Sequence, residues 1–191
     1  MNLDREGRQA IVARGGGATI LDLDGPPGRL PPLEHGDTIF AAISPDGRWA
    51  ATGTHNGFGV RVWDVRTANL EVKLIPDDRN SRPVFSPDGR WLLTATGTEF
   101  GIWEPGTWRS VRQIPREQTG DVAAAAAFTL DGKVLAVADS LNTIRLFDTE
   151  TWRPLARLRG PDADLINMAL VQFTPDGTRL LMDAQDPAVP G

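Results

Sequence analysis

A short turn that ends in an acidic residue and a glycine recurs five times along this chain of 191 residues. The glycines of successive turns lie 40 to 45 residues apart. Proline, aspartate and glycine favour tight turns, because proline presets φ, aspartate caps the turn and glycine accepts a positive φ. The four later turns contain Asp46, Gly47, Asp88, Gly89, Asp131, Gly132, Asp176 and Gly177. A turn kept at one period predicts an array of similar structural units.

A second marker keeps the same period. About a dozen residues after each turn, a run with alternating polarity ends in an acidic residue, as in residues 60–64 (VRVWD). Alternation with a period near two predicts β-strands, and a further short strand follows each acidic residue. In three repeats an aromatic residue precedes the acid: Trp63 and Asp64, Trp103 and Glu104, Phe147 and Asp148. Together the markers predict four strands in each repeat.

Amino-acid composition argues against several classes of binding partner and of chemical site. The chain has 25 acidic and 20 basic residues, a net charge of −5, and its basic residues are dispersed, which argues against nucleic acid or an anionic membrane as a partner. It has no cysteine, so disulfides, thiolate nucleophiles and Cys-ligated zinc are excluded. The first residues are charged and contain no apolar leader, and no run approaches the length of a membrane span. We therefore expect a cytoplasmic protein.

The repeated residues resemble those of the WD40 family of β-propellers. The resemblance covers nearly the whole chain and rests on the turn at residues 44–47 (SPDG) followed, at the right distance, by strands ending in VWD, IWE or LFD. Pairs such as Arg48–Trp49 resemble those of bacterial WD40 proteins, which often form part of larger signalling polypeptides. The resemblance implies an all-β fold, a propeller of four-stranded antiparallel blades, whose usual role is to bind other proteins.

The repeats predict about four to five blades, and hence an incomplete ring. We expect a partial blade one at 1–33, complete blades at 34–75, 76–115 and 116–159, and a partial blade five at 160–191. Three arrangements fit this count. The chain is a piece of a larger ring, two copies assemble into one ring, or the strand at 168–174 closes the ring by supplying the first strand of blade one.

No residue set predicts catalysis, a cofactor or a metal site. The acids of the turns and of the third strands occupy equivalent repeat positions, which indicates a structural role. His35 stands where WD40 repeats carry a histidine that joins the Trp-Asp tryptophan in a hydrogen-bonded network. Glu34 replaces the glycine before it, and the matching aspartate is missing, so the resemblance implies a degraded network. His35 is either packed or available to a ligand.

The loops that enter the first strand and join the second to the third share one rim in WD40 proteins. This implies a rim that mixes acids with fewer arginines and binds a protein or peptide with a basic or mixed surface. The candidate partner-binding residues are His35, Asp37, His55, Asn56, Asp77, Asp78, Arg79, Asp121 and Asn142.

Three local features give further expectations. Residues 122–128 (VAAAAAF) have helical propensity, but the repeat register favours the innermost strand of a blade. Pro83 is expected at the start of an innermost strand. Trp108 and Trp152 lie in loops, where they either cover the blade or form binding hot spots.

The sequence therefore predicts a non-enzymatic interaction or scaffolding module. One alternative is a structural or regulatory fragment that completes a larger propeller. Another is a propeller enzyme with an active site in the central channel, which needs convergent His, Asp, Glu or Arg side chains that the expected inner strands lack.

Overall fold

The computed structural model describes residues 2–25, 31–55, 57, 59–75, 80–117, 124–140, 143–159 and 167–185. Every regular element in these ranges is a β-strand, and the strands form four four-stranded sheets and one two-stranded sheet, all antiparallel. This confirms the predicted all-β propeller architecture. Within the same ranges no helix is long and apolar enough to cross a membrane.

The sheets, which we call blades 1 to 5, are each built from strands consecutive in the chain. Blade 1 contains β1 (Asn2–Leu3), β2 (Gln9–Arg14), β3 (Gly17–Asp22) and β4 (Leu33–Glu34). Blade 2 contains β5 (Thr38–Ile43), β6 (Trp49–Thr54), β7 (Val60–Asp64) and β8 (Leu70–Ile75). Blade 3 contains β9 (Ser81–Phe85), β10 (Leu92–Thr96), β11 (Glu99–Glu104) and β12 (Arg109–Pro115). Blade 4 contains β13 (Ala126–Phe128), β14 (Val134–Ser140), β15 (Thr143–Asp148) and β16 (Pro154–Arg159), and blade 5 contains β17 (Asn167–Phe173) and β18 (Leu180–Gln185).

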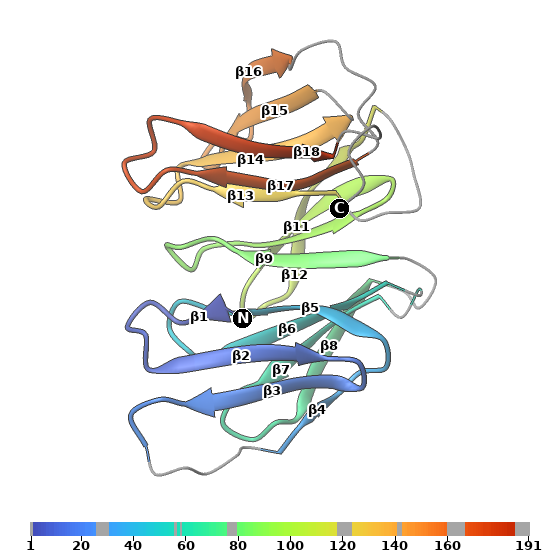
Figure 1. Cartoon of the computed structure of the whole chain (residues 1–191), viewed down its shortest axis with the longest axis vertical. Helices are drawn as coiled ribbons and strands as arrows, with labels where there is room; N and C mark the ends of the chain where they lie inside the picture. The colour runs from blue at the N-terminus through green and yellow to red at the C-terminus, as the bar shows by residue number, and fades with distance from the viewer. Residues whose placement is uncertain are drawn as a thin grey trace.

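The blades follow one another around an open arc (Figure 1), which agrees with the expected incomplete ring. Among the described residues, no strand of blade 1 is hydrogen-bonded to a strand of blade 5. The arrangement in which the strand at 168–174 closes blade 1 is wrong. That segment forms β17, which pairs with β18, while β1 supplies the first strand of blade 1.

The acidic turns fold by one recurring set of hydrogen bonds. In blade 2 the Ser44 hydroxyl donates to Asp46 Oδ1 over 2.6 Å and accepts the Trp49 amide over 2.8 Å. Gly47 has a φ of 70°, which a residue with a side chain rarely adopts. Ser86, Thr129 and Thr174 occupy the place of Ser44 in blades 3, 4 and 5 and make the same bond to their own aspartates.

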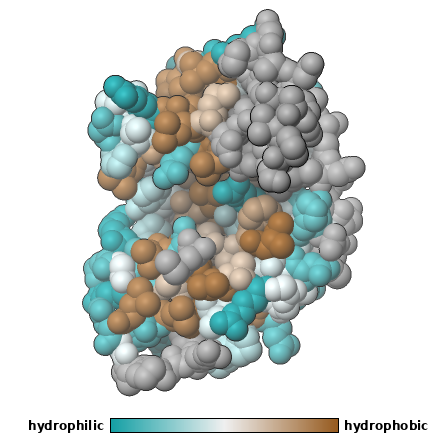
Figure 2. Space-filling view, in the orientation of Figure 1, coloured by the Kyte–Doolittle hydropathy of each residue, from teal (hydrophilic) through white to brown (hydrophobic). Residues whose placement is uncertain are grey.

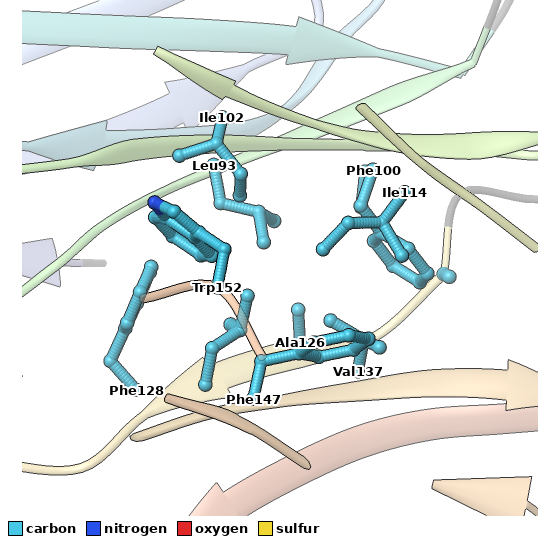
Figure 3. Close-up of a cluster of buried hydrophobic side chains, with 12 residues drawn as sticks. Leu93, Phe100, Ile102, Ile114, Ala126, Phe128, Val137, Phe147 and Trp152 are labelled. Atoms are coloured by element: carbon cyan, nitrogen blue, oxygen red, sulfur yellow. The ribbon is translucent and has the colours of Figure 1, made fainter. Parts of the chain in front are cut away.

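Each pair of neighbouring blades shares one apolar cluster, because alternate residues of a strand point to opposite faces. On β6, Ala50 packs towards blade 1, whereas Trp49 and Ala51 pack towards blade 3. The cluster between blades 3 and 4 is shown in Figure 3, where Phe147 and Trp152 of blade 4 lie over the side chains of blade 3. Burial between blades therefore holds the arc together.

Tryptophan pairs add to two of these interfaces. Trp108 packs edge-on against Trp49 of the preceding blade, with ring centroids 5.2 Å apart, and Trp152 does the same with Trp91 over 5.3 Å. Trp108 and Trp152 have φ values of 54° and 56°, a left-handed conformation that is unusual for a bulky residue. Both tryptophans cover the neighbouring blade. Of the two expected roles, the structure therefore matches cover of the blade and not an exposed binding hot spot.

Three details differ from the expectations. Pro83 lies in the middle of β9, opposite Thr94, and not at its start; β9 is an edge strand, where a missing N–H breaks no ladder. The alanine-rich segment is a strand only over β13, while residues 122 and 123 lie outside the described residues. β4 reaches Glu34, one residue past the bound expected for blade one.

A close approach between blades 2 and 3 requires glycine at position 53. A Cβ built on Gly53 would lie 2.7 Å from Pro83 Cδ and closer still to the Ser81 carbonyl oxygen. We expect Gly53→Ala to lower the free energy of unfolding by about 1–3 kcal/mol, because backbone must move to admit the methyl group. Gly15→Ala is the control, since nothing lies within 4 Å of its Cβ position. Urea unfolding of both variants measures the difference, and equal stabilities would contradict the prediction.

The turn aspartates predict loss of stability in acid. Burial alone raises the pKa of Asp88, but hydrogen bonds from Ser86 and Arg90 outweigh it and hold that pKa below its ordinary value. The hydrogen bond from Thr129 lowers the pKa of Asp131. A lowered folded-state pKa stabilises the fold above the unfolded pKa of about 4, and this contribution disappears as the pH falls through the folded value. Urea midpoints between pH 7 and 3 should therefore fall less steeply for Asp88→Asn than for the unmodified chain; identical slopes would refute this.

Candidate functional site

A central cavity of about 500 Å³ lies where the innermost strands meet. The lining includes Ile39 and Phe40 from β5, Phe85 from β9 and Phe128 from β13. Figure 2 shows hydrophobic residues on both sides of the middle of the face seen in Figure 1. Innermost strands are sheet edges, and residues from several of them line the cavity. The cavity is concave, and although most of its lining residues are apolar, the surface that they present to it is mainly polar.

Arg82 is the charged residue among the described lining residues, whose other polar members are Asn2 and Gln172. Its guanidinium lies over the Phe40 ring, 5.3 Å from the centroid. Burial lowers the pKa of Arg82 from its ordinary value, although a guanidinium remains charged at neutral pH. A half-buried cation beside an aromatic ring offers a ligand both apolar contact and a partner for a carboxylate.

The same lining offers little for catalysis. Its described members include no aspartate, glutamate, histidine or hydroxyl side chain, so it supplies neither a general acid–base pair nor an activated nucleophile. Over the described ranges, no group of three or more His, Cys, Asp or Glu side chains is placed to hold a metal ion. What the arrangement can do is bind.

His35 is packed inside the protein, with an exposed fraction of 1%. Its Nδ1 lies 2.8 Å from Thr52 Oγ1, which also accepts the indole N–H of Trp63 over 2.9 Å. The network therefore keeps its histidine, hydroxyl and tryptophan despite the replaced glycine. Of the two roles considered for His35, this position matches the structural one, because a buried side chain presents no surface to a partner.

The structure brings two other rim candidates together. Asp37 and His55 are both exposed, and the His55 amide donates to the Asp37 carbonyl oxygen over 3.4 Å. Asp37 has a φ of 54°, so its loop is a tight left-handed turn. The remaining candidates lie outside the described residues: Asn56, Asp77, Asp78, Arg79, Asp121 and Asn142.

A charged group between blades 3 and 4 was missed by sequence reasoning. Arg145 donates to the fully buried Asp139 over 2.7 Å and to the Pro115 carbonyl over 2.6 Å. Asp139 also accepts the Glu117 amide over 3.0 Å. These bonds fix the segment that leads from blade 3 into blade 4. The sequence carries one signal of this contact, which is an arginine at the same position of the third strand in blade 2. That residue, Arg61, donates to the Glu34 carbonyl over 3.2 Å.

The tryptophan–hydroxyl bond follows a consistent substitution rule. In blade 3 the Trp103 indole N–H donates to Thr94 over 2.9 Å, as Trp63 does to Thr52 in blade 2. At the two equivalent positions, blade 4 has Val137 and Phe147, and blade 1 has Val12 and Leu21. Donor and acceptor are kept together or removed together, which avoids a buried group without a partner.

This rule predicts energetic coupling between Thr52 and Trp63. Thr52→Val should cost about 1–3 kcal/mol, because it leaves the buried indole N–H without an acceptor. Adding Trp63→Phe removes that donor, so the double variant should be more stable than the sum of the single effects predicts, by at least about 0.5 kcal/mol. A double-mutant cycle by urea unfolding measures the coupling. Strictly additive effects would show that the bond contributes nothing.

Comparison with known proteins identifies the repeat and the fold. The family model of the WD domain, G-beta repeat (WD40), matches residues 32–64. Among solved structures, hydrazine synthase of Kuenenia stuttgartiensis superposes with a TM-score of 0.76 at 20% sequence identity, over 99% of this chain and 56% of that chain. At that identity the likeness shows the fold alone, and 1236 chains with significant matches show how widespread the fold is. No curated protein sequence gives a significant match.

Proposed function

From a WD40 repeat at residues 32–64 within an open β-propeller, we propose that this chain is a non-enzymatic module that binds a protein or peptide. WD40 propellers generally serve protein interactions, and here the inner strands supply the concave surface. The observation that carries the proposal is the central cavity, with Arg82 stacked over Phe40 among apolar residues. Such a lining suits an extended segment with apolar side chains and a carboxylate.

The rim extends this surface. Asp37 and His55 are exposed beside the loop that enters β5. They offer hydrogen-bonding groups for the part of the ligand that remains outside the cavity. A scaffold role in a larger bacterial signalling polypeptide and a cytoplasmic location are further parts of this proposal. Both rest on the resemblance to bacterial WD40 proteins.

Selection from a displayed library of random peptides tests the cavity. Peptides that bind the full chain should be enriched in acidic and apolar residues, and Arg82→Gln should weaken their binding by about tenfold or more, since a charged hydrogen bond contributes about 1.5–3 kcal/mol. Arg48→Gln is the matched control. Arg48 also stacks on an aromatic ring, 4.5 Å from Trp49, but lies at the turn end of its blade. Binders that are equally sensitive to both substitutions, or to neither, would count against the cavity.

A second function has its own support: the chain serves as a structural fragment that completes a larger propeller. The open arc favours it, since blade 5 has two strands in the described part of the chain where the other blades have four. The two functions are compatible because they use different surfaces. An enzyme is disfavoured by the cavity lining given above, although the structurally similar hydrazine synthase is named as an enzyme.

A further inference from the structure

A second cavity, which we call the turn cavity, lies among the acidic turns, at the end of the innermost strands opposite the rim candidates Asp37 and His55. The turns project to one side of the arc, on the left in Figure 1. The turn cavity measures about 590 Å³ and adjoins the central one, because both include Ile43 and Phe85 in their linings. Unlike the central cavity, it presents mainly apolar surface with a few polar side chains. That composition is usual for a ligand site.

Hydrogen bonds from the start of blade 1 hold the walls of the turn cavity together. Asn2 Oδ1 accepts the Ile43 amide over 3.2 Å, and the Arg5 amide donates to the Pro45 carbonyl oxygen over 3.1 Å. The Arg5 guanidinium donates to the carbonyl oxygen of Pro87 in blade 3. Blade 1 is therefore tied to blades 2 and 3 at this end, and the cavity is formed before a ligand arrives.

The turn of blade 4 departs from the repeat at a residue that lines this cavity. Its aspartate follows Leu130, whereas the aspartates of the turns in blades 2, 3 and 5 follow proline. The turn does not depend on the leucine, since Thr129 donates to Asp131 over 2.7 Å as the equivalent residues of the other turns do. Leu130 is 68% exposed, and Leu3 of the same lining is 48% exposed. Two exposed leucines at one cavity form an apolar surface that a partner is able to cover.

One carboxylate of the lining is available to a ligand. Hydrogen bonds from Thr129 and from the Lys133 amide hold the pKa of Asp131 below its ordinary value, so this side chain is ionised at neutral pH. Both bonds go to Oδ1, and Oδ2 lies 4.0 Å from the exposed Lys133 ammonium, a contact that contributes little. Asp88, the other acid of the lining, is already paired with Arg90 over 2.6 Å. The available acceptor is therefore Asp131 Oδ2.

We propose that the turn cavity binds an extended segment of a partner protein in which a lysine or arginine lies next to an apolar residue. The apolar side chain of the segment packs against Leu3 and Leu130, and its cation reaches Asp131. A backbone carbonyl oxygen of the segment accepts a hydrogen bond from Arg5. Charge complementarity favours a basic segment, since the chain has a net charge of −5. This preference is opposite to that of the central cavity, where Arg82 attracts a carboxylate.

Two capped tripeptides, leucine–lysine–leucine and leucine–glutamate–leucine, test this site on the isotope-labelled full chain. The lysine peptide should shift the amide resonances of residues 129–132 in a saturable way. It should bind about tenfold or more tightly than the glutamate peptide, because a like charge is placed beside the Asp131 carboxylate in the second case. High salt should reduce the difference. Equal affinities, a preference for the glutamate peptide, or no saturable shift in the millimolar range would overturn the proposal.

The repeat supplies matched variants. Leu130→Pro introduces the residue of the other turns, so the turn should still fold, and it should weaken the lysine peptide by about fivefold or more because apolar contact is lost. Asp131→Asn should weaken it by about threefold or more. Asp46→Asn is the control, since Asp46 makes the same hydrogen bonds in its own turn but does not line the turn cavity. An unchanged affinity in Leu130→Pro, or equal losses in the two asparagine variants, would contradict the proposal.

The two cavities are tested independently. Arg82→Gln should leave the affinity for the lysine peptide unchanged, because Arg82 lines only the central cavity. Peptides selected for the central cavity should bind the Leu130→Pro variant normally. Failure of the turn cavity is therefore distinguishable from failure of the proposed function.

Discussion

A β-sheet with two apolar faces is stable in water only if other elements cover both faces, and in this chain each blade relies on its neighbours for that cover. Alternate residues of β6 serve two different interfaces, so a single strand links three blades. A blade at either end of such a series has a neighbour on one face only, unless the first and last blades meet and close a ring. In the described part of the chain, the first and last blades are not hydrogen-bonded to each other. Stability and the geometry of the arc both depend on this burial of sheet faces.

At one position of the blades, a buried hydroxyl group and an indole N–H occur together as a hydrogen-bonded pair. The Thr52–Trp63 and Thr94–Trp103 bonds join a buried hydroxyl to an indole N–H, while blades 1 and 4 carry apolar residues at both positions. The Trp49–Trp108 and Trp91–Trp152 pairs are ring contacts across an interface, and the buried indole N–H groups of Trp108 and Trp91 make no hydrogen bond within the protein. Such pairs constrain substitutions more than single residues do, because changing one member leaves either a gap or an unsatisfied donor. Residues of the cavity are paired as well, because Arg82 stacks over Phe40 and Asn2 Oδ1 accepts the Ile43 amide.

The sequence was sufficient for the architecture because turns and third strands repeat with a period and a mechanism. Glycine at positive φ and the Ser44–Asp46 hydrogen bond are local, so residue order alone predicts them. Contacts between blades are not local. The burial of His35, the Asp139–Arg145 pair and the close approach at Gly53 depend on how two sheets meet, which no period encodes. The cavity residue Arg82 was missed for the same reason. Its position beside Phe40 arises from the curvature that brings β5 and β9 together.

The left-handed tryptophans have a consequence for how the chain is made on the ribosome. Trp152 belongs to blade 4 yet completes the packing of Trp91 in blade 3. An N-terminal blade that has already emerged is therefore left with one apolar face open until the third strand and turn of the following blade are synthesised. During synthesis from the N-terminus, each new blade covers the apolar face of the blade before it. The apolar face of the new blade then stays exposed until the next blade is made. A pause in translation inside a blade would prolong the exposure of the blade before it.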